Sequence, residues 1–288
     1  MQTLTRASNC YSGAALQKYL HVLNIGIQNT LVYRVNFLFR SLFGLIPLIA
    51  TISLWRTIYS GAPSPQGGGG TVVAGYSLAQ MISYYLVVTI VDALTAVNED
   101  DWQIAADIKD GNISQFLLKP IDYLSYRLCL FGAGRLMYTA VAFLPVTLFI
   151  LYQRNYFVLP ADGATVGWFA VSLVLTGLLQ FFSSFTMALL AFWVLEVSTF
   201  IFILFAFEYI AGGHLFPLDI LPPTIERVLH YTPFPYQLFF PVSIYVGKTT
   251  GRALYQGLLI QTAWVVASYL LARWVWKRGI RKYSAVGG

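Results

Sequence analysis

The chain has 288 residues, of which 57% are hydrophobic and only 10% are charged. Soluble domains are about one quarter charged, so this composition excludes a large soluble domain and indicates a polytopic membrane protein. The net charge of +6 does not indicate nucleic-acid binding, because the basic residues lie singly or in pairs beside apolar segments and cluster only at the C-terminus. A transmembrane helix needs about 20 residues, so the length suits a single membrane domain, residues 1–288, with about six crossings.

Residues 1–30 comprise a polar tail and a helix that is too polar to cross a bilayer. Between Ala15 and Gln28, apolar residues recur at helical spacing: Leu16, Leu20, Leu23 and Ile27. This pattern predicts an amphipathic helix that lies in the headgroup plane and leads into the first crossing. The tail lacks the charged and apolar regions of a cleavable signal, so we expect the first crossing to act as its own insertion signal.

Six apolar stretches predict six crossings. They lie at about residues 37–59, 72–97, 126–153, 166–195, 197–212 and 254–276, and the fourth and fifth turn around Glu196. The last is followed by basic residues from Lys277 to Lys282, which the positive-inside rule places in the cytoplasm. An even number of crossings then places the N-terminus in the cytoplasm as well.

One polar stretch, residues 98–125, separates the second crossing from the third. It contains the acids Glu99, Asp100, Asp101, Asp107, Asp110 and Asp122, with the apolar residues Ile108, Ile113, Phe116 and Leu117 among them. The predicted topology places this stretch in the cytoplasm. The pattern favours a docking element for a soluble partner, and the alternative is an inert solvated loop.

Residues 212–252 form neither a crossing nor a plain loop. The segment includes Phe216, Pro217, Pro222, Pro233 and Pro235. Prolines at this density exclude one long helix, and non-helical backbone at membrane depth needs protein or water around it. We therefore predict an extracytoplasmic re-entrant segment of short helices. A simple outer loop is the alternative, although residues 238–246 are very apolar for free solvent.

The sequence offers no recognisable catalytic site. Gly247-Lys248-Thr249 resembles the end of a phosphate-binding loop, but Val242 stands where that motif needs its first glycine. The histidines His21, His214 and His230 lack metal-ligand spacing. We therefore predict no enzyme, no catalytic residue and no metal site.

Three charged residues lie inside the apolar runs, namely Asp92, Arg135 and Glu208. An ionisable group at the bilayer centre costs a few kcal/mol or more, so each is a candidate functional residue. Arg135 can lean toward the cytoplasmic interface and pair with Asp92, while Glu208 is placed to contact His214 or to line a cavity. A secondary transporter is less favoured, because neither a chain of acids nor an inverted repeat is recognisable.

Several stretches together resemble the permease subunits of the ABC-2 class of ATP-binding-cassette transporters, in their bacterial branch. They are Asp107–Pro120, Phe216–Pro222, Thr232–Tyr236, Phe240–Lys248 and Arg281–Gly288. The resemblance covers nearly the whole chain. It implies an all-α membrane protein with six transmembrane helices, an N-terminal interfacial helix, a cytoplasmic coupling helix and an extracytoplasmic re-entrant segment.

The resemblance also implies partners. The permease would pair with a second permease, identical or homologous, in the lipid bilayer of the bacterial cytoplasmic (inner) membrane, above two copies of a cytoplasmic ATPase that bind ATP and Mg. This chain would itself bind no cofactor. The coupling helix would correspond to residues 101–121, with ATPase contacts at Asp107, Ile108, Lys109, Asp110, Gly111, Ile113, Phe116 and Leu117.

The resemblance implies a cargo path along crossings one, two and five, where Tyr84, Tyr85 and Phe205 would contact cargo or simply pack. The outer loop after the first crossing is short and includes no capture domain, which favours export over import. The alternatives are a secondary transporter and a membrane scaffold or assembly protein.

Overall fold

The computed structural model describes residues 2–61, 72–73, 75–97, 100–160, 162–194 and 196–283, without the side chains of residues 2–16 and of Asp100. Residues 98, 99 and 284–288, and most of the predicted loop 60–71, lie outside this description. The chain is an all-α membrane protein, as predicted. Its elements in order are α1 (Gln2–Leu31), α2 (Arg34–Gly61), β1 (Val72–Val73), β2 (Tyr76–Ser77), α3 (Leu78–Thr95), α4 (Asp100–Lys109), α5 (Ile113–Leu117), α6 (Tyr123–Tyr152), α7 (Gly163–Ala188), η1 (Leu189–Phe192), α8 (Ser198–Ala211), η2 (Leu218–Ile220), α9 (Pro223–His230), η3 (Phe234–Gln237), α10 (Phe239–Tyr245) and α11 (Gly251–Lys282).

Among the described residues, five helices are long and apolar enough to cross a membrane: α2, α3, α6, α7 with η1, and α11. The predicted fifth crossing is the apolar helix α8, which has 14 residues. At 1.5 Å per residue it is about 21 Å long, which is shorter than the roughly 30 Å hydrocarbon core. A sixth crossing therefore stays a prediction.

The second crossing begins later than predicted. Val72–Val73 pairs with Tyr76–Ser77 in a small antiparallel hairpin, in which Gly75 has a φ of 78°. Ser77 then starts α3 with a capping box, since its hydroxyl accepts from the Gln80 backbone N–H and the Gln80 side chain accepts from the Ser77 N–H. The turn and the cap together set the helix start at Leu78 and not at Val72.

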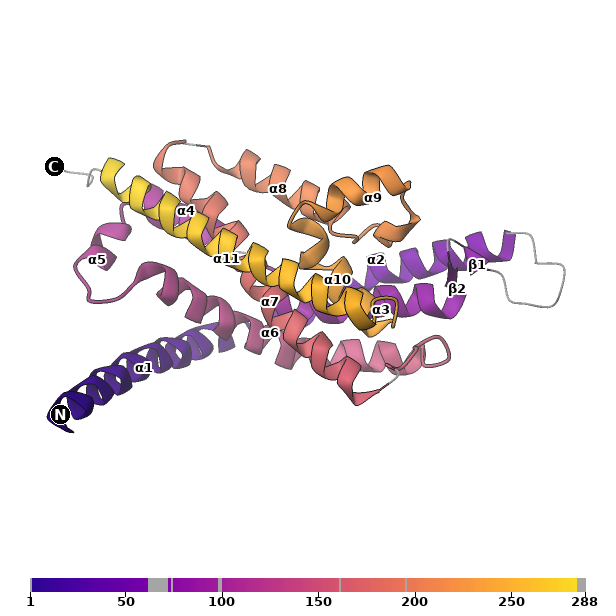
Figure 1. The fold of residues 1–288 in the computed structure, drawn as a ribbon, viewed down its shortest axis with the longest axis horizontal. Coiled ribbons are helices and arrows are strands. Elements are labelled where there is room, and N and C mark those ends of the chain that lie inside the picture. The colour runs from indigo at the N-terminus through magenta and orange to yellow at the C-terminus, as the bar shows by residue number, and fades with distance from the viewer. Residues whose placement is uncertain are drawn as a thin grey trace.

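The long helices run roughly along the long axis of the molecule (Figure 1). Helix α5 and the C-terminal end of α11 lie at one end, and the β1–β2 hairpin lies at the other (Figure 1). Helix α7 is central, because it packs against α3, α4, α10 and α11. Many of the fully buried side chains, including Tyr84, Phe181 and Phe185, come from α3 and α7.

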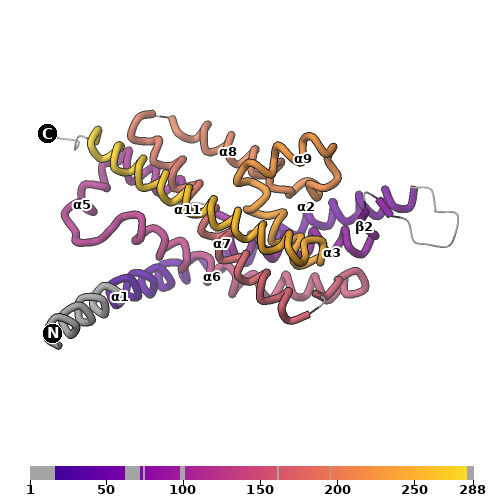
Figure 2. Tube along the Cα trace, viewed as in Figure 1, coloured from indigo at the N-terminus to yellow at the C-terminus, as the bar shows by residue number. Residues whose placement is uncertain are grey.

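The predicted N-terminal amphipathic helix is part of a longer helix, α1, which packs against α6 (Figure 2). The approach is close at Gly26, where an added Cβ would lie 2.8 Å from the Ala133 Cβ. Glycine thus allows the two backbones to meet. The position of α1 in the headgroup plane stays a prediction.

The proline-rich segment 212–252 consists of four short helical pieces, η2, α9, η3 and α10. Pro217, Pro222 and Pro233 are the N-cap residues of η2, α9 and η3. Proline suits a helix start because the N–H groups of the first turn have no acceptor within the helix, so the N–H that proline lacks is not needed there. Residues 239–244 of α10 are buried, so the segment is not a simple loop.

This segment is tied to α3 by two tyrosines. The Tyr84 hydroxyl donates to the Gly213 carbonyl oxygen at 2.7 Å, and the Tyr85 hydroxyl donates to that of Leu215 at 2.6 Å. Tyr84 is fully buried. Both side chains therefore pack inside the chain. Of the two alternatives for these aromatic residues, contact with cargo and packing, this arrangement corresponds to packing.

Gly257 of α11 gives a test of this packing. An added Cβ would overlap the ring of Phe240, which is itself buried. We expect Gly257→Ala to lower the free energy of unfolding by about 1–3 kcal/mol, because a tight core resists an added methyl group. Thermal unfolding in detergent measures the effect.

The matched control is Gly167→Ala in α7, where an added Cβ meets no atom within 4 Å. There the better helix propensity of alanine should leave the stability unchanged or raise it by up to about 1 kcal/mol. Equal effects at the two positions would contradict the packing of α11 described here.

Candidate functional site

The polar stretch between α3 and α6 folds as two short helices joined by a turn. Helix α4 packs against α7 and η1 and buries Ile104 and Ile108. Gly111, with a φ of 76°, makes the turn, and Ile113 of α5 is fully buried. Ile108 and Ile113 therefore hold the α4–α5 element to the bundle, and their contact with an ATPase stays a prediction.

A buried polar network fixes the same element to α6. The Arg127 guanidinium donates to the Asp107 carboxylate, and the Tyr123 hydroxyl donates to Asp107 Oδ2 at 2.8 Å. Arg127 Nε in turn donates to the Tyr123 hydroxyl oxygen at 3.0 Å. The ring of Phe116 packs against Tyr123 and Tyr126, with centroids 5.1 and 4.9 Å apart. Asp107 and Phe116 thus make contacts within the chain.

Further contacts connect this region to α11. The Tyr283 hydroxyl donates to the Gly111 carbonyl oxygen at 3.0 Å. Asp122 caps α6 through Ser125 and forms an ion pair with Arg273 at 2.5 Å. Burial raises the pKa of Asp122, but the hydrogen bonds from Ser125 and Arg273 outweigh it, so that pKa lies below its usual value.

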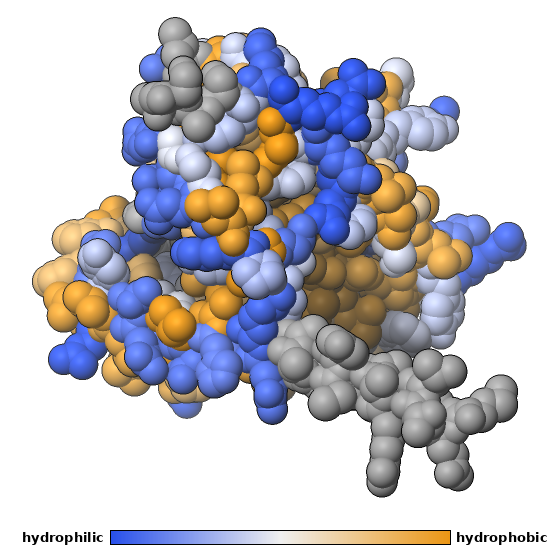
Figure 3. All heavy atoms as spheres, turned by 90° about the vertical axis from the view of Figure 1, so that its left-hand side faces the viewer, coloured by the Kyte–Doolittle hydropathy of each residue, from blue (hydrophilic) through white to orange (hydrophobic). Residues whose placement is uncertain are grey.

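The outer surface of the α4–α5 element is exposed, and we call it the tip. It consists of Lys109, Asp110, Leu117, Leu118 and Lys119. The exposed fraction is 51% for Leu117 and 88% for Leu118. Figure 3, which looks onto this end of the molecule, shows hydrophilic residues intermixed with apolar ones. Two exposed leucines among charges suit a contact with another protein.

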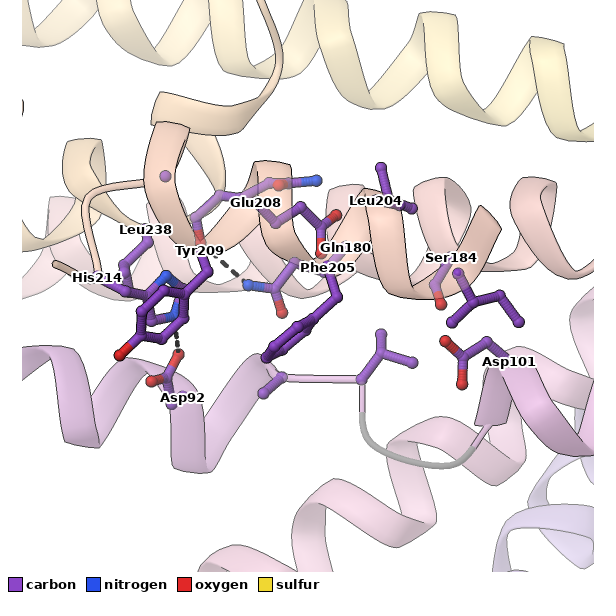
Figure 4. Close-up of a pocket in the computed structure, with 15 residues that line it drawn as sticks. Asp92, Asp101, Gln180, Ser184, Leu204, Phe205, Glu208, Tyr209, His214 and Leu238 are labelled. Atoms are coloured by element: carbon purple, nitrogen blue, oxygen red, sulfur yellow. Dashed lines mark hydrogen bonds and ion pairs between the residues drawn. The ribbon is translucent and has the colours of Figure 1, made fainter. Parts of the chain in front are cut away.

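A polar cavity lies inside the bundle, where α3, α4, α7 and α8 meet the segment that follows α8 (Figure 4). Its polar lining comprises Asp92, Asp101, Gln180, Ser184, Glu208, His214 and Gln237, and Phe205 and Tyr209 add aromatic walls. Asp92 Oδ1 lies 3.2 Å from His214 Nε2. Glu208 lines the same cavity as His214.

Arg135 lies elsewhere in the bundle. Its guanidinium lies over the rings of Phe131 and Tyr138, 5.9 and 5.3 Å from their centroids, and it lines a second cavity beside α1. The pairing of Arg135 with Asp92 stays a prediction. Within the described residues, no group of three metal-binding side chains comes together.

Sequence reasoning missed Leu118, Gln180 and Gln237. A signal existed for Gln180, because it is an uncharged polar residue in the middle of an apolar stretch. Only the fold reveals that Gln237 lies beside it, since 57 residues separate the two.

These features define a multi-pass helical membrane protein with a polar cavity in its bundle and a polar two-helix element at one end. The sequence model described as ABC-2 family transporter protein matches residues 45–287, which is most of the chain. The chain therefore belongs to the ABC-2 family of transporters, and its role is that of a permease. Membrane proteins of this family work with ATPase partners in ABC transporters. None of the curated proteins compared with the chain matches it.

Proposed function

We propose that the chain is the membrane-spanning permease subunit of an ATP-driven exporter in the bacterial cytoplasmic membrane, with both termini in the cytoplasm. A second permease, identical or homologous, completes the path. Two copies of a cytoplasmic ATPase bind ATP and Mg and dock on the tip. The observation that carries the proposal is the α4–α5 element, which exposes leucines while its other face is fixed to the bundle.

The internal contacts of the element suit it to transmit force. Helix α4 packs on α7, Asp107 is bound to Arg127 of α6, and Gly111 is bound to Tyr283 at the end of α11. A push on the tip therefore acts on three long helices together. Closure of the ATPases around ATP would move these helices and open the path between the two permeases outward.

Copurification tests the proposal. The full-length tagged chain is extracted from its native membrane in mild detergent, its partners are identified by mass spectrometry, and ATP hydrolysis is measured. We expect a stoichiometric cytoplasmic ATPase and ATP hydrolysis in the complex. A chain that repeatedly emerges alone, under conditions that preserve known membrane complexes, would contradict the proposal and favour a scaffold.

The carboxyl groups of Asp92 and Glu208 in the cavity favour one second candidate, a secondary transporter driven by an ion gradient. In that case transport would persist after ATP depletion and stop when the ion gradient is collapsed. The exporter proposal expects the opposite result in both experiments.

A further inference from the structure

The cavity between α3, α7 and α8 is rich in groups that accept hydrogen bonds. Asp92, Asp101 and Glu208 contribute carboxyl groups. Among the described residues that line it there is no lysine or arginine, and the one basic side chain, His214, contacts Asp92. This chemistry favours a ligand that donates hydrogen bonds and carries positive charge.

Two glutamines add acceptors with unused capacity. Gln180 is only 9% exposed, and its Nε2 donates to the Gln237 backbone carbonyl oxygen at 3.2 Å. A carbonyl oxygen can only accept, so the amide orientation of Gln180 is fixed by this bond. Its Oε1 is buried without a hydrogen-bond partner and faces the space between α8 and α3 (Figure 4).

The amide group of Gln237 resembles that of Gln180 in its hydrogen bonding. It is 2% exposed, its Nε2 lies 3.3 Å from Ser183 Oγ, and its side chain also hydrogen bonds the Glu208 carboxyl group. The Gln237 Oε1 is likewise buried without a partner. A buried acceptor left unsatisfied is destabilising, so a donor that enters the cavity recovers part of that free energy.

The size of the cavity limits what can enter. Its volume is about 70 Å³, enough for a few water-sized groups. A larger cavity of about 330 Å³ shares Asp92, Phe205, Tyr209 and His214 with it, and its remaining lining is mostly uncharged, with Arg40. A small polar head group therefore fits the first cavity, and an apolar body fits the second.

We propose that this pair of cavities binds a protonated primary amine with an apolar body. The ammonium group lies between the Glu208 carboxyl group and the Oε1 atoms of Gln180 and Gln237, so that its three N–H donors meet three acceptors. The apolar body lies along Phe205 and Tyr209. The statement that such an amine is the transported cargo rests on the proposed function. The binding itself does not, because it needs no ATPase.

Calorimetric titration of the purified full-length chain in lipid nanodiscs tests the binding. The probes are 4-phenylbutylamine, its neutral analogue 4-phenylbutanol and its anionic analogue 4-phenylbutanoate, each corrected for its heat with empty nanodiscs. We expect the amine to bind at least about tenfold more tightly than the alcohol, since hydrogen bonds to a charged group are stronger than those between neutral groups. The anion should not bind.

Variants separate the site from general partitioning. Glu208→Gln and Gln180→Leu should each weaken amine binding about tenfold or more, while Gln180→Glu, which adds a charge of the right sign, should strengthen it. The matched control is Glu226→Gln on α9, the same chemical change outside the cavity, and it should leave binding unchanged.

The inference would be overturned if the amine and the alcohol bound equally, or if substitutions at Glu208 and Gln180 left amine binding unchanged. The cavity would then hold only water. Because the assay uses the chain without its ATPase, such a result leaves the copurification test of the proposed function intact. Conversely, amine binding by a chain that copurifies with no ATPase would support the inference and contradict the proposed function.

Discussion

The double substitution Leu117→Glu and Leu118→Glu is expected to weaken binding of the ATPase strongly while the membrane bundle stays folded. Both side chains are exposed, and neither belongs to the buried face of the α4–α5 element. Loss of two apolar side chains from an interface removes about 3–6 kcal/mol of burial free energy, and two unpaired carboxylates weaken it further. The dissociation constant should rise at least about 100-fold.

Binding of the purified ATPase to nanodiscs that contain the permease measures this effect, and the unfolding midpoint of the variant reports on its fold. Leu159→Glu is the matched control, because Leu159 is 73% exposed and lies outside the α4–α5 element, in the loop between α6 and α7. Normal affinity and normal coupled transport in the double variant would place the ATPase contact elsewhere.

Arg127→Met is expected to destabilise the chain by about 3–5 kcal/mol. Arg127 is 6% exposed and holds Asp107 and Tyr123 in one network. Methionine leaves the Asp107 carboxylate without its guanidinium in a largely buried position, and an uncompensated buried charge is costly. Thermal unfolding followed by tryptophan fluorescence measures the loss.

The double variant Arg127→Met with Asp107→Asn removes both charges and should recover most of that stability, since burying an ion pair costs about as much as the pair returns. Tyr123 stays in place as a neutral partner. A double variant no more stable than Arg127→Met alone would show that Arg127 acts through packing and not through its charge.

The sequence predicted the helical membrane fold and the positions of most long helices, because apolar runs of about 20 residues carry that information locally. It placed the start of α3 too early, since the Gly75 turn and the Ser77 cap are weak signals within an apolar run. It also predicted the short helices after α8, where proline density leaves few alternatives.

The site was less accessible to sequence reasoning. Ile108 and Ile113 have the composition of interface anchors, but the fold buries them, and no local pattern distinguishes the two outcomes. Likewise, Asp92 meets His214 across 122 residues of sequence. Contacts of this kind depend on how helices pack, which single-sequence periodicity does not encode.

The ten-residue helix α4 contributes side chains both to the internal cavity and to the tip. Its first turn contributes Asp101 to the wall of the internal cavity, and its last turn contributes Lys109 to the tip. A molecule in the cavity that favours one position of α4 must change the affinity of whatever docks on the tip, and linkage requires the reverse effect to be equal in free energy. Occupancy of the cavity would then be sensed by the ATPase before any transport has taken place.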